Sequence, residues 1–514
     1  MRPWFLLPLL VGFNSLACSE TDTVADTPLD GAGQAGQAAS SAGGGGGVGG
    51  GTATDPPLQG GAGTSAGSAS SDAAGAAGDD GGVTSITTSP LALYPAFSTI
   101  ITDYYVRCAD GDNALTVTTS TASGDTTRDV TLQPNDATNV DDRYFIRCLP
   151  ADFPAMTVTT RGTPTAGYYL ANSNNYAMVL DTHGVPVWYA RGTSMINVDT
   201  PAVDTISLMP NFAPPFGAGS VSNFEIRSLA TDLVTVVSAA AGAQTDAHEF
   251  RTLPNGDHLL FTTPAQTGVD LTGLNALGNN ETIMGCIIQE IDASNNLVWS
   301  WDATDHVDPV LESLEPLAVT VGDVSVTDVF HCNSIEVDGS GNLLLSMRHA
   351  NALFYIDRTT DKVTWKLGGS AYNKDGAALI HVENDAQTTF SMQHDARFRA
   401  NGNVTLFDDH GAGKGVARGI EYALDHDTGV ATPVFQTLGS AAAGYEGSFR
   451  RYDDGESVVG WGFVNGDPRF LTEVDAQGND VLDMAFDDAE VNYRSVKVPT
   501  SQFDLATLRA SAGK

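Results

Sequence analysis

One pattern recurs through the chain after Gly167, and it limits the fold more than any other feature. In each copy, a strand-like run ends near an Asp or Ser, a short polar turn follows, and a second strand-like run completes the unit. Three copies carry a Trp at the same place, at Trp188, Trp299 and Trp365. Short alternating runs around polar turns are typical of β-hairpins. In order, the copies read YAMVLDTHGVPVWYARG, NFEIRSLATDLVTVVSA, IIQEIDASNNLVWSWDA, LFYIDRTTDKVTWKLGG, IEYALDHDTGVATPVFQ and FLTEVDAQGNDVLDMAFD.

Hairpins with Gly-containing turns lie between these units. Four of them read TLPNGDHLLFT, VDGSGNLLLSMR, FRANGNVTLFDD and RRYDDGESVVGW. A module of about four strands therefore recurs at a spacing of roughly 50–70 residues, which is typical of the blades of a β-propeller. Helical periodicity is nearly absent, and 514 residues are too many for one ordinary compact domain. We therefore expect an all-β fold with a six-bladed β-propeller over residues 165–500 and a C-terminal tail over residues 501–514.

The N-terminal part differs in composition from the repeats. Residues 83–164 contain alternating, β-branched runs, namely LTVTTST, DVTLQP and MTVTT (Met156–Thr160), which predict a small β-sandwich domain. Residues 19–82 are mainly Gly, Ala, Ser, Thr and Asp, without Lys or Arg. Such a segment buries too little apolar surface to offset the entropy of the chain, so we expect a disordered linker.

The first 18 residues resemble an export signal. Arg2 precedes the apolar run Trp4–Phe13, which is too short to span a bilayer. The small residues Ser15 and Ala17 suit an ordinary signal peptidase, which would cut after Ala17. Alternatively, Cys18 is the lipidated first residue of a lipoprotein, since a flexible tether follows it, although Ser15 stands where a lipobox usually has a Leu-like residue. Both interpretations predict export to the bacterial cell envelope, either as an outer-membrane lipoprotein or in the periplasm.

The charge of the chain limits its partners. It has 25 basic and 62 acidic residues, giving a formal net charge of −37. So acidic a chain repels phosphate backbones, and we expect no nucleic-acid partner. An anionic ligand would need a local basic cluster.

Four cysteines besides Cys18 permit two disulfides in an exported protein. We favour the pair Cys108–Cys148, because both residues lie in the predicted sandwich domain. The pairing of Cys286 with Cys332 is left open.

Three histidines occupy equivalent positions in different hairpins. His248, His331 and His394 each precede a short strand that leads into a Gly-containing turn and a second apolar strand. Because equivalent positions in different blades have the same radius and height, we expect them to point toward one central site. Arg348 ends the hairpin that begins at His331, and its planar guanidinium suits tetrahedral oxyanions. The set predicts an anion pocket, in which a neutral imidazole can act as nucleophile.

Two other interpretations of these residues compete with the anion pocket. Any single histidine here more commonly caps a strand through hydrogen bonds. Three histidines could also ligate zinc or iron, but Arg348 would be repelled by a dication and no carboxylate stands at an obvious ligand position. We therefore predict no metal and no cofactor. We leave Asp395 out of the site, because adjacent residues of a strand face opposite sides.

Longer stretches around these residues resemble the arylsulfotransferase (arylsulfate sulfotransferase) family, and in particular its arylsulfotransferase-like branch. The resemblance is strong over residues 248–427 and does not extend to the linker or the small N-terminal domain. The stretches are AHEFRTLPNGDHLL, FHCNSIEVDGSGNLLLSMRHANALFYIDRTTDKVTWKLGG, FSMQHDARFRANGNVTLFDDHG and ARGIEYALD.

This resemblance implies a six-bladed propeller, often with an N-terminal β domain. It also implies transfer of a sulfuryl group from a phenolic sulfate ester to a phenol, without a nucleotide donor. The histidine that forms a sulfohistidine intermediate matches His394, and the anion-binding positions match His331 and Arg348. His248 matches a further channel histidine. The implied partners are an aryl sulfate donor and a phenolic acceptor.

Asn333 and His349 are further candidates for the substrate-binding wall of this pocket. The alternative to an enzyme is a non-catalytic cell-surface propeller that binds an anionic or aromatic ligand, because membership of a fold family does not prove activity. We predict no particular oligomeric state.

Overall fold

The structure is a computed structural model. It describes residues 82–212, 222–321, 324–411, 415–488 and 490–514. Residues 1–81, which include the predicted export signal, Cys18 and most of the predicted linker, lie outside the described residues, so the expectations for them stay predictions. Within the described ranges, no helix is long and apolar enough to cross a membrane.

Nearly all of the regular structure is β-strand, which confirms the prediction of an all-β fold. In the part of the chain that the structure describes, the α-helices are short, namely α1 (Ala303–His306) and α2 (Leu505–Ser511). Two further turns, Ala240–Gly242 and Thr500–Gln502, are 3-10 helical.

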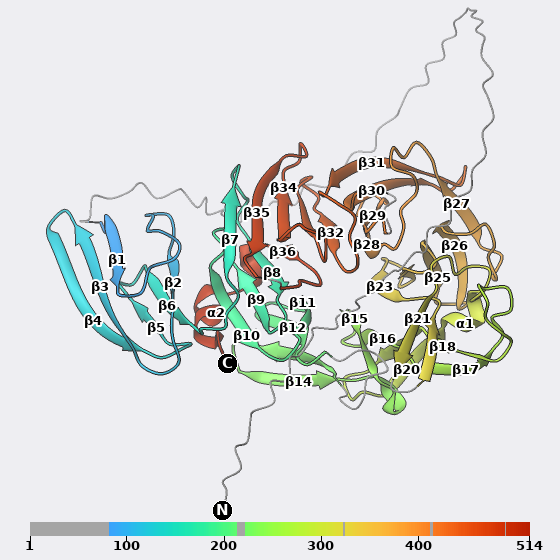
Figure 1. Cartoon of the computed structure of the whole chain (residues 1–514), viewed down its shortest axis with the longest axis horizontal. Helices are drawn as coiled ribbons and strands as arrows, with labels where there is room; N and C mark the ends of the chain where they lie inside the picture. The colour runs from blue at the N-terminus through green and yellow to red at the C-terminus, as the bar shows by residue number, and fades with distance from the viewer. Residues whose placement is uncertain (1–81, 213–221, 322–323, 412–414, 489) are drawn as a thin grey trace, which may run out of the picture. The chain divides into compact units, whose positions relative to one another are not determined.

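Sheets of antiparallel neighbouring strands follow one another through the repeat region (Figure 1). The first contains β8 (Tyr168–Asn172), β9 (Tyr176–Leu180), β10 (Pro186–Arg191) and β36 (Val496–Val498), and the second contains β11 (Ile196–Asp199), β12 (Thr205–Met209), β13 (Phe224–Ser228) and β14 (Leu233–Val237). The third contains β15 (Thr245–Thr252), β16 (His258–Thr262), β19 (Ile287–Ile291) and β20 (Leu297–Asp302). The next strands are β23 (Cys332–Val337), β24 (Leu343–Met347), β25 (Ala352–Asp357) and β26 (Lys362–Gly368), then β28 (His394–Phe398), β29 (Val404–Asp408), β30 (Arg418–Asp425) and β31 (Val430–Leu438). The last four are β32 (Ser448–Arg451), β33 (Ser457–Gly460), β34 (Arg469–Val474) and β35 (Asp480–Phe486).

The first strands of these sheets lie against one another in a ring. The contacts join β11 to β15, β15 to β23, β23 to β28, β28 to β32, and β32 to β36. The ring closes because β36 pairs with β8, which contacts β11. Innermost strands surround the central channel of a β-propeller in this way. The starts of β15, β23 and β28 therefore face one axis.

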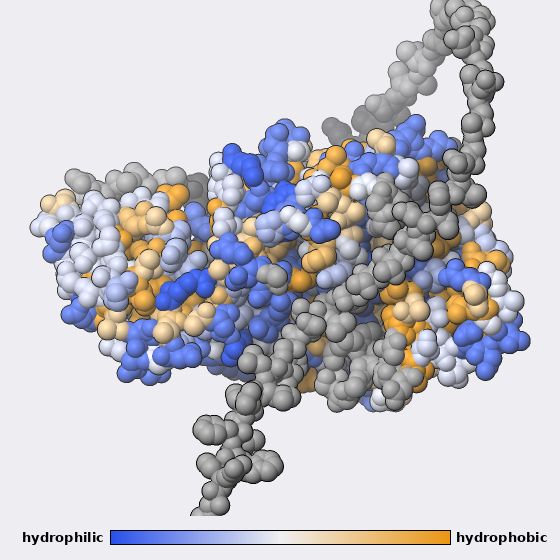
Figure 2. Space-filling view, in the orientation of Figure 1, coloured by the Kyte–Doolittle hydropathy of each residue, from blue (hydrophilic) through white to orange (hydrophobic). Residues whose placement is uncertain are grey.

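Several inner strands are buried along their whole length. Every residue of β9, β16, β24 and β29 is buried, since each of these sheets packs between two others. The outer strand β14 is largely exposed. On the face shown in Figure 2, hydrophilic and hydrophobic residues are interspersed.

Additional strands lie outside this regular order. β27 (Ala378–Val382) pairs in parallel with both β26 and β31 and so links two neighbouring sheets. A separate sheet has the order β17 (Ala265–Val269), β18 (Glu281–Met284), β22 (Val324–Asp328) and β21 (Leu317–Val321).

The strand β7 (Met156–Thr160) lies in a different sheet from the one that its sequence predicts. We expected it in the N-terminal sandwich, but it pairs with β35 along its whole length, from Met156 opposite Phe486 to Thr160 opposite Leu482. Its β-branched residues favour a strand in either sheet. Hydrogen-bonding to the open edge of β35 places it in the sheet of β32–β35.

The remaining N-terminal strands form two three-stranded sheets. One has the order β1 (Ser85–Ser89), β3 (Asn113–Thr121), β4 (Gly124–Leu132), and the other β2 (Asp103–Arg107), β6 (Phe145–Leu149), β5 (Ala137–Asn139). Apolar residues of both sheets belong to one buried cluster. A disulfide joins Cys108 to Cys148, the pairing that the sequence favours.

The C-terminal tail carries its own anchoring contacts. Leu508 of α2 is buried, and Arg509 forms hydrogen bonds of 2.7 Å with both carboxylate oxygens of Asp103 on β2. The backbone N–H of Gly513 donates to the carbonyl of Tyr189 on β10.

Candidate active site

His248 lies on the innermost strand β15 and is held by an aspartate two residues earlier. Its Nδ1 atom is 2.7 Å from Oδ1 of Asp246, and its backbone N–H donates to the same oxygen. Burial lowers the pKa of His248, but the Asp246 carboxylate outweighs burial, and the pKa ends above the ordinary value. His248 is therefore more readily protonated than a free imidazole.

His331 immediately precedes β23 and is held in the same way. Its Nδ1 atom is 2.6 Å from Oδ2 of Asp328, the last residue of β22. Burial lowers the pKa of His331 to about 4 against the opposite effect of Asp328, and the nearby His349 and His248 lower it further. The next residue, Cys332, forms a disulfide with Cys286.

His394 begins β28, and its partner is the residue after β29. Because β28 and β29 are antiparallel, the start of one lies beside the end of the other. The Nδ1 atom of His394 is 3.2 Å from Oδ2 and 3.3 Å from Oδ1 of Asp409. Its Nε2 atom has no hydrogen-bond partner among the described residues. Burial, then Arg348 and His331, hold the pKa of His394 well below the ordinary value, so the imidazole is neutral.

Arg348 follows β24 and is buried beside His394. Its Nε atom is 3.8 Å from Oδ2 of Asp409, the carboxylate that also faces His394. One Nη donates to Nε2 of His349 at 3.0 Å, and the other to the carbonyl of Gly444 at 2.8 Å. These contacts fix the plane of the guanidinium.

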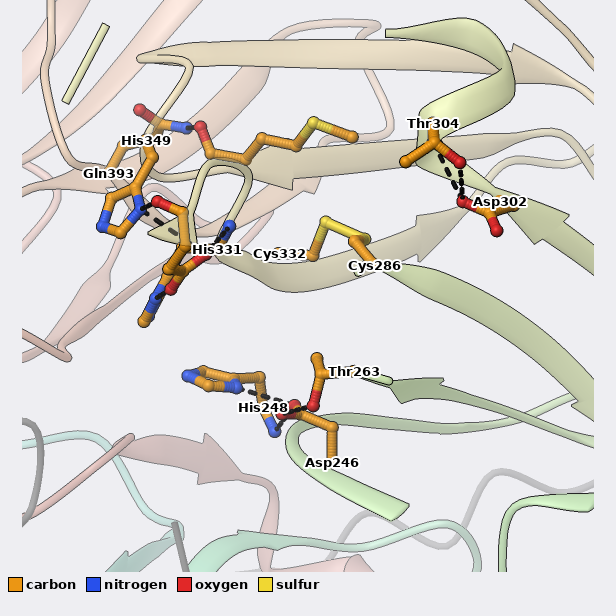
Figure 3. The surroundings of a disulfide bond; sticks show 12 residues. Asp246, His248, Thr263, Cys286, Asp302, Thr304, His331, Cys332, His349 and Gln393 are labelled. Atoms are coloured by element: carbon orange, nitrogen blue, oxygen red, sulfur yellow. Dashed lines mark hydrogen bonds and ion pairs between the residues drawn. A yellow bond between two sulfur atoms is a disulfide. The ribbon is translucent and has the colours of Figure 1, made fainter. Parts of the chain in front are cut away.

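The structure brings the four histidines together. The ring centroids of His248 and His331 are 4.9 Å apart, those of His331 and His349 are 4.8 Å apart, and those of His331 and His394 are 6.5 Å apart. In Figure 3, His331 lies between His349 and His248, next to the disulfide of Cys286 and Cys332. Residues separated by up to 146 positions in the sequence thus share one site.

His349 and Asn333 support the site through contacts inside the protein. His349 donates from Nδ1 to the backbone carbonyl of Asp328 at 2.8 Å and accepts from Arg348 at Nε2, so both ring nitrogens are engaged. Asn333, fully buried on β23, donates to the carbonyl of Gln393 at 2.6 Å. Neither contact is the substrate contact that the sequence predicts, although the Oδ1 atom of Asn333 is buried without a partner among the described residues.

Asp395 faces away from the pocket, into a buried cluster of charges. Its carboxylate lies 2.7 Å from Arg450, 2.7 Å from Arg397 and 3.0 Å from Arg494. Burial raises its pKa, but the three guanidinium groups outweigh this and hold it far below the ordinary value. Glu249 accepts from Arg397 and Arg494 in the same cluster. These ions are paired with one another and support the fold.

The aspartates of the site are the residues that sequence reasoning missed. The sequence shows no carboxylate at an obvious ligand position, yet an aspartate faces each of His248, His331 and His394 in the structure. The signal that could have revealed two of them is an Asp two or three residues before the histidine, as at Asp246 and Asp328. Asp409 carries no such signal, because only strand pairing brings it to His394.

Asp328, His331 and His349 lie close enough to be considered as ligands of a metal ion. The hydrogen bonds argue against this use. The Nε2 atom of His349 accepts from the Arg348 guanidinium, and its Nδ1 atom donates to a carbonyl. A dication bound at either nitrogen of His349 would break one of these bonds and would lie near the Arg348 guanidinium, so these residues do not fit a metal ion.

The sequence of the chain matches the model of a known family. The sequence model of the family described as Arylsulfotransferase (ASST) matches residues 221–487, just over half of the chain. All of His248, His331, Arg348 and His394 lie in the matched range. No curated protein matches the chain.

Solved structures resemble it only distantly. A protein of unknown function from Bacteroides caccae has 11% identity and a TM-score of 0.39, with 65% of this chain and 99% of that chain covered. Virginiamycin B lyase from Staphylococcus aureus has 7% identity and a TM-score of 0.31, with 69% and 90% covered. A luciferin-regenerating enzyme has 12% identity and a TM-score of 0.31, with 56% and 76% covered. These scores are too low to bear on function.

The family assignment therefore rests on the sequence match over the repeat region, which includes the clustered histidines and Arg348. The chain belongs to the arylsulfotransferase family.

Proposed function

We propose that this protein transfers a sulfuryl group from a phenolic sulfate ester to a phenol, without a nucleotide donor, through a sulfohistidine on His394. The proposal rests mainly on one observation: the Nδ1 atom of the buried His394 imidazole faces Asp409, and Arg348 lies against the same carboxylate. Membership of the arylsulfotransferase family supports the reaction class.

The nucleophile is the Nε2 atom of His394. With Nδ1 donating to Asp409, Nε2 carries the lone pair, and burial keeps the ring unprotonated at neutral pH. Attack on sulfur forms an N–S bond while the bond from sulfur to the aryl oxygen breaks. The ring becomes positively charged in this step, and the Asp409 carboxylate stabilises that charge.

The sulfuryl oxygens need positive groups throughout the transfer. Arg348 supplies a guanidinium whose plane is fixed by His349 and Gly444. His248, whose pKa is raised by Asp246, supplies a second positive group when protonated, and its ring lies 4.9 Å from that of His331. This local basic cluster is what an anionic substrate requires in so acidic a chain.

A phenol then takes the sulfuryl group from His394. Because donor and acceptor react in turn, one pocket serves both, and the kinetics are ping-pong. The two disulfides are consistent with an exported protein.

The test uses 4-nitrophenyl sulfate as donor and phenol as acceptor. We expect wild-type protein to release nitrophenol and mass spectrometry to find one sulfuryl adduct on His394. His394→Ala should lose both the release of nitrophenol and the adduct. His381→Ala changes an exposed histidine and serves as the control, which should keep both the release and the adduct on His394. Tight binding of the sulfate ester without release or adduct would instead support the non-catalytic ligand-binding propeller. An adduct on another residue would refute the role of His394.

A further inference from the structure

Glu446 lies in the segment that connects β31 to β32, at the edge of the site. The carbonyl of Gly444 accepts from Arg348 at 2.8 Å, and the N–H of Gly447 donates to the carbonyl of Tyr493 at 3.1 Å. Glu446 is thus held between two anchored residues. Its φ of +66° is in the left-handed region, which a side chain such as Glu rarely adopts. The surrounding contacts fix this strained backbone, as is common at functional sites.

The carboxyl of Glu446 has an environment unlike that of the other acidic groups of the site. Its Oε2 atom is buried and has no hydrogen-bond partner among the described residues. Asp246, Asp328 and Asp409 each face an imidazole instead. Burial raises the pKa of Glu446 to about 7, and the charge of His248 opposes this only partly. The group therefore has both protonation states available near neutral pH.

The charged groups around Glu446 come from three elements. His248 and Asp246 belong to β15, and the two share a short hydrogen bond. Tyr493 precedes β36, and its hydroxyl donates to the carbonyl of His248 at 2.9 Å. Arg494 next to it is paired with Glu249 in the buried cluster.

The third element is the end of the β23–β24 hairpin. It contributes Arg348, which binds His349 and the carbonyl of Gly444. Since these groups are engaged with one another, the protonation of Glu446 depends mainly on its burial and on the charge of His248.

We propose that Glu446 is the acid–base residue of this site: its carboxyl protonates the phenolate that leaves the donor, and its carboxylate then takes the proton of the acceptor phenol. This inference rests on the proposed sulfotransferase reaction.

The protons and electron pairs balance over the two half-reactions. In the first, Nε2 of His394 bonds to sulfur, the S–O bond breaks, and the aryl oxygen keeps the electron pair and takes the Glu446 proton. In the second, the acceptor oxygen bonds to sulfur as its proton moves to Glu446, and the N–S electron pair returns to His394. The enzyme ends in its starting state.

The neighbouring histidines do not serve this purpose as well. The pKa of His394 lies well below the ordinary value, and that of His331 is about 4. Neither imidazole therefore carries a proton that it could donate at neutral pH. The Nδ1 atom of His248 is already engaged by Asp246, which raises the pKa of the imidazole and suits it to bind a sulfuryl oxygen. An acid–base group works best when its pKa is near the working pH, as that of Glu446 is.

The first test compares donors whose leaving groups differ in basicity. Glu446→Gln should lower kcat/KM for phenyl sulfate roughly 100-fold, because phenolate needs a proton. The leaving group of 4-nitrophenyl sulfate is a phenolate that is stable without a proton. With this donor, Glu446→Gln should therefore lower kcat/KM by less than about 3-fold. With phenyl sulfate, the rate of the wild type should rise as the pH falls and Glu446 becomes protonated. This rise should be absent in Glu446→Gln. Glu383→Gln, which changes an exposed carboxylate, serves as control. Equal losses with both donors would overturn the proposal.

A second test does not depend on turnover. Benzenesulfonate presents a sulfonate on a C–S bond that cannot be transferred. Its binding at pH 7, measured by calorimetry in buffers of different ionisation enthalpy, should take up about half a proton in wild type and none in Glu446→Gln. Equal uptake in both proteins would overturn the assignment. Proton uptake in wild type, together with no adduct on His394 after incubation with 4-nitrophenyl sulfate, would refute the sulfotransferase reaction and with it the catalytic role, while leaving the titrating carboxyl assigned.

Discussion

The Nδ1 atom of His394 lies 3.2 Å from Oδ2 of Asp409, and the same oxygen is 3.8 Å from Nε of Arg348. One buried carboxylate thus lies against both the proposed nucleophile and the proposed oxyanion-binding group. Such a carboxylate selects the imidazole tautomer and stabilises positive charge on the ring during attack.

Replacement of Asp409 by Asn should remove the charge and leave the shape. We expect Asp409→Asn to lower the rate of sulfuryl adduct formation roughly 100-fold or more, because the tautomer of His394 is no longer selected and its charge is not balanced. Rapid-quench mass spectrometry of the adduct measures this rate. An unchanged rate would show that the carboxylate serves only the fold.

The depressed pKa of His331 predicts how stability depends on pH. In the unfolded chain, His331 binds a proton below its ordinary pKa of about 6.5, whereas the folded protein binds it only near pH 4. The unfolded state therefore holds more protons between these values, and the free energy of unfolding should fall as pH falls through this window.

Urea unfolding of wild type and His331→Gln at several pH values between 4.5 and 7 tests this expectation. The wild-type curve should depend more steeply on pH than the variant curve, because the variant lacks the titrating group. Parallel curves would mean that His331 titrates alike in the folded and unfolded states.

The two disulfides should differ in their effect on activity. Cys332 follows His331 directly, so Cys286→Ser with Cys332→Ser should release the start of β23 and lower both activity and stability, the latter by roughly 2–4 kcal/mol. Cys108→Ser with Cys148→Ser should lower stability by a similar amount but leave sulfuryl transfer unchanged. Melting temperature and turnover of each double variant measure the two effects. An equal loss of turnover in both would contradict a local role for the first disulfide.

The buried cluster around Glu249 should dominate the stability of the central ring. Glu249 accepts from Arg397 on β28 and from Arg494 near β36, and so joins strands that are far apart in sequence. We expect Glu249→Gln to lower the free energy of unfolding by roughly 3–5 kcal/mol, because two buried guanidinium groups lose their counter-charge. Glu383→Gln at an exposed position should change it by less than about 0.5 kcal/mol. If Glu249→Gln lowered the free energy of unfolding by less than about 1 kcal/mol, the carboxylate of Asp395 alone would be enough to balance the charge of the two guanidinium groups.

The sequence by itself determined the class of fold and the place of the histidines in it. Period-two runs and Gly-containing turns specify hairpins locally, so the strands of the repeats could be recognised without tertiary information. His248, His331 and His394 stand at the same point of successive hairpins, and a closed ring of sheets brings such points to one axis. A short motif and a family resemblance were sufficient to single out Arg348.

Only the tertiary structure decided which groups act on these residues. Asp409 reaches His394 through the pairing of β28 with β29, and β7 joins β35 across more than 300 positions. Glu446 has an ordinary sequence context, and its properties come from burial beside His248 and from the absence of a partner for Oε2 among the described residues. Hydrogen-bond partners, burial and pKa depend on distances between segments remote in sequence, which local patterns of residues do not encode.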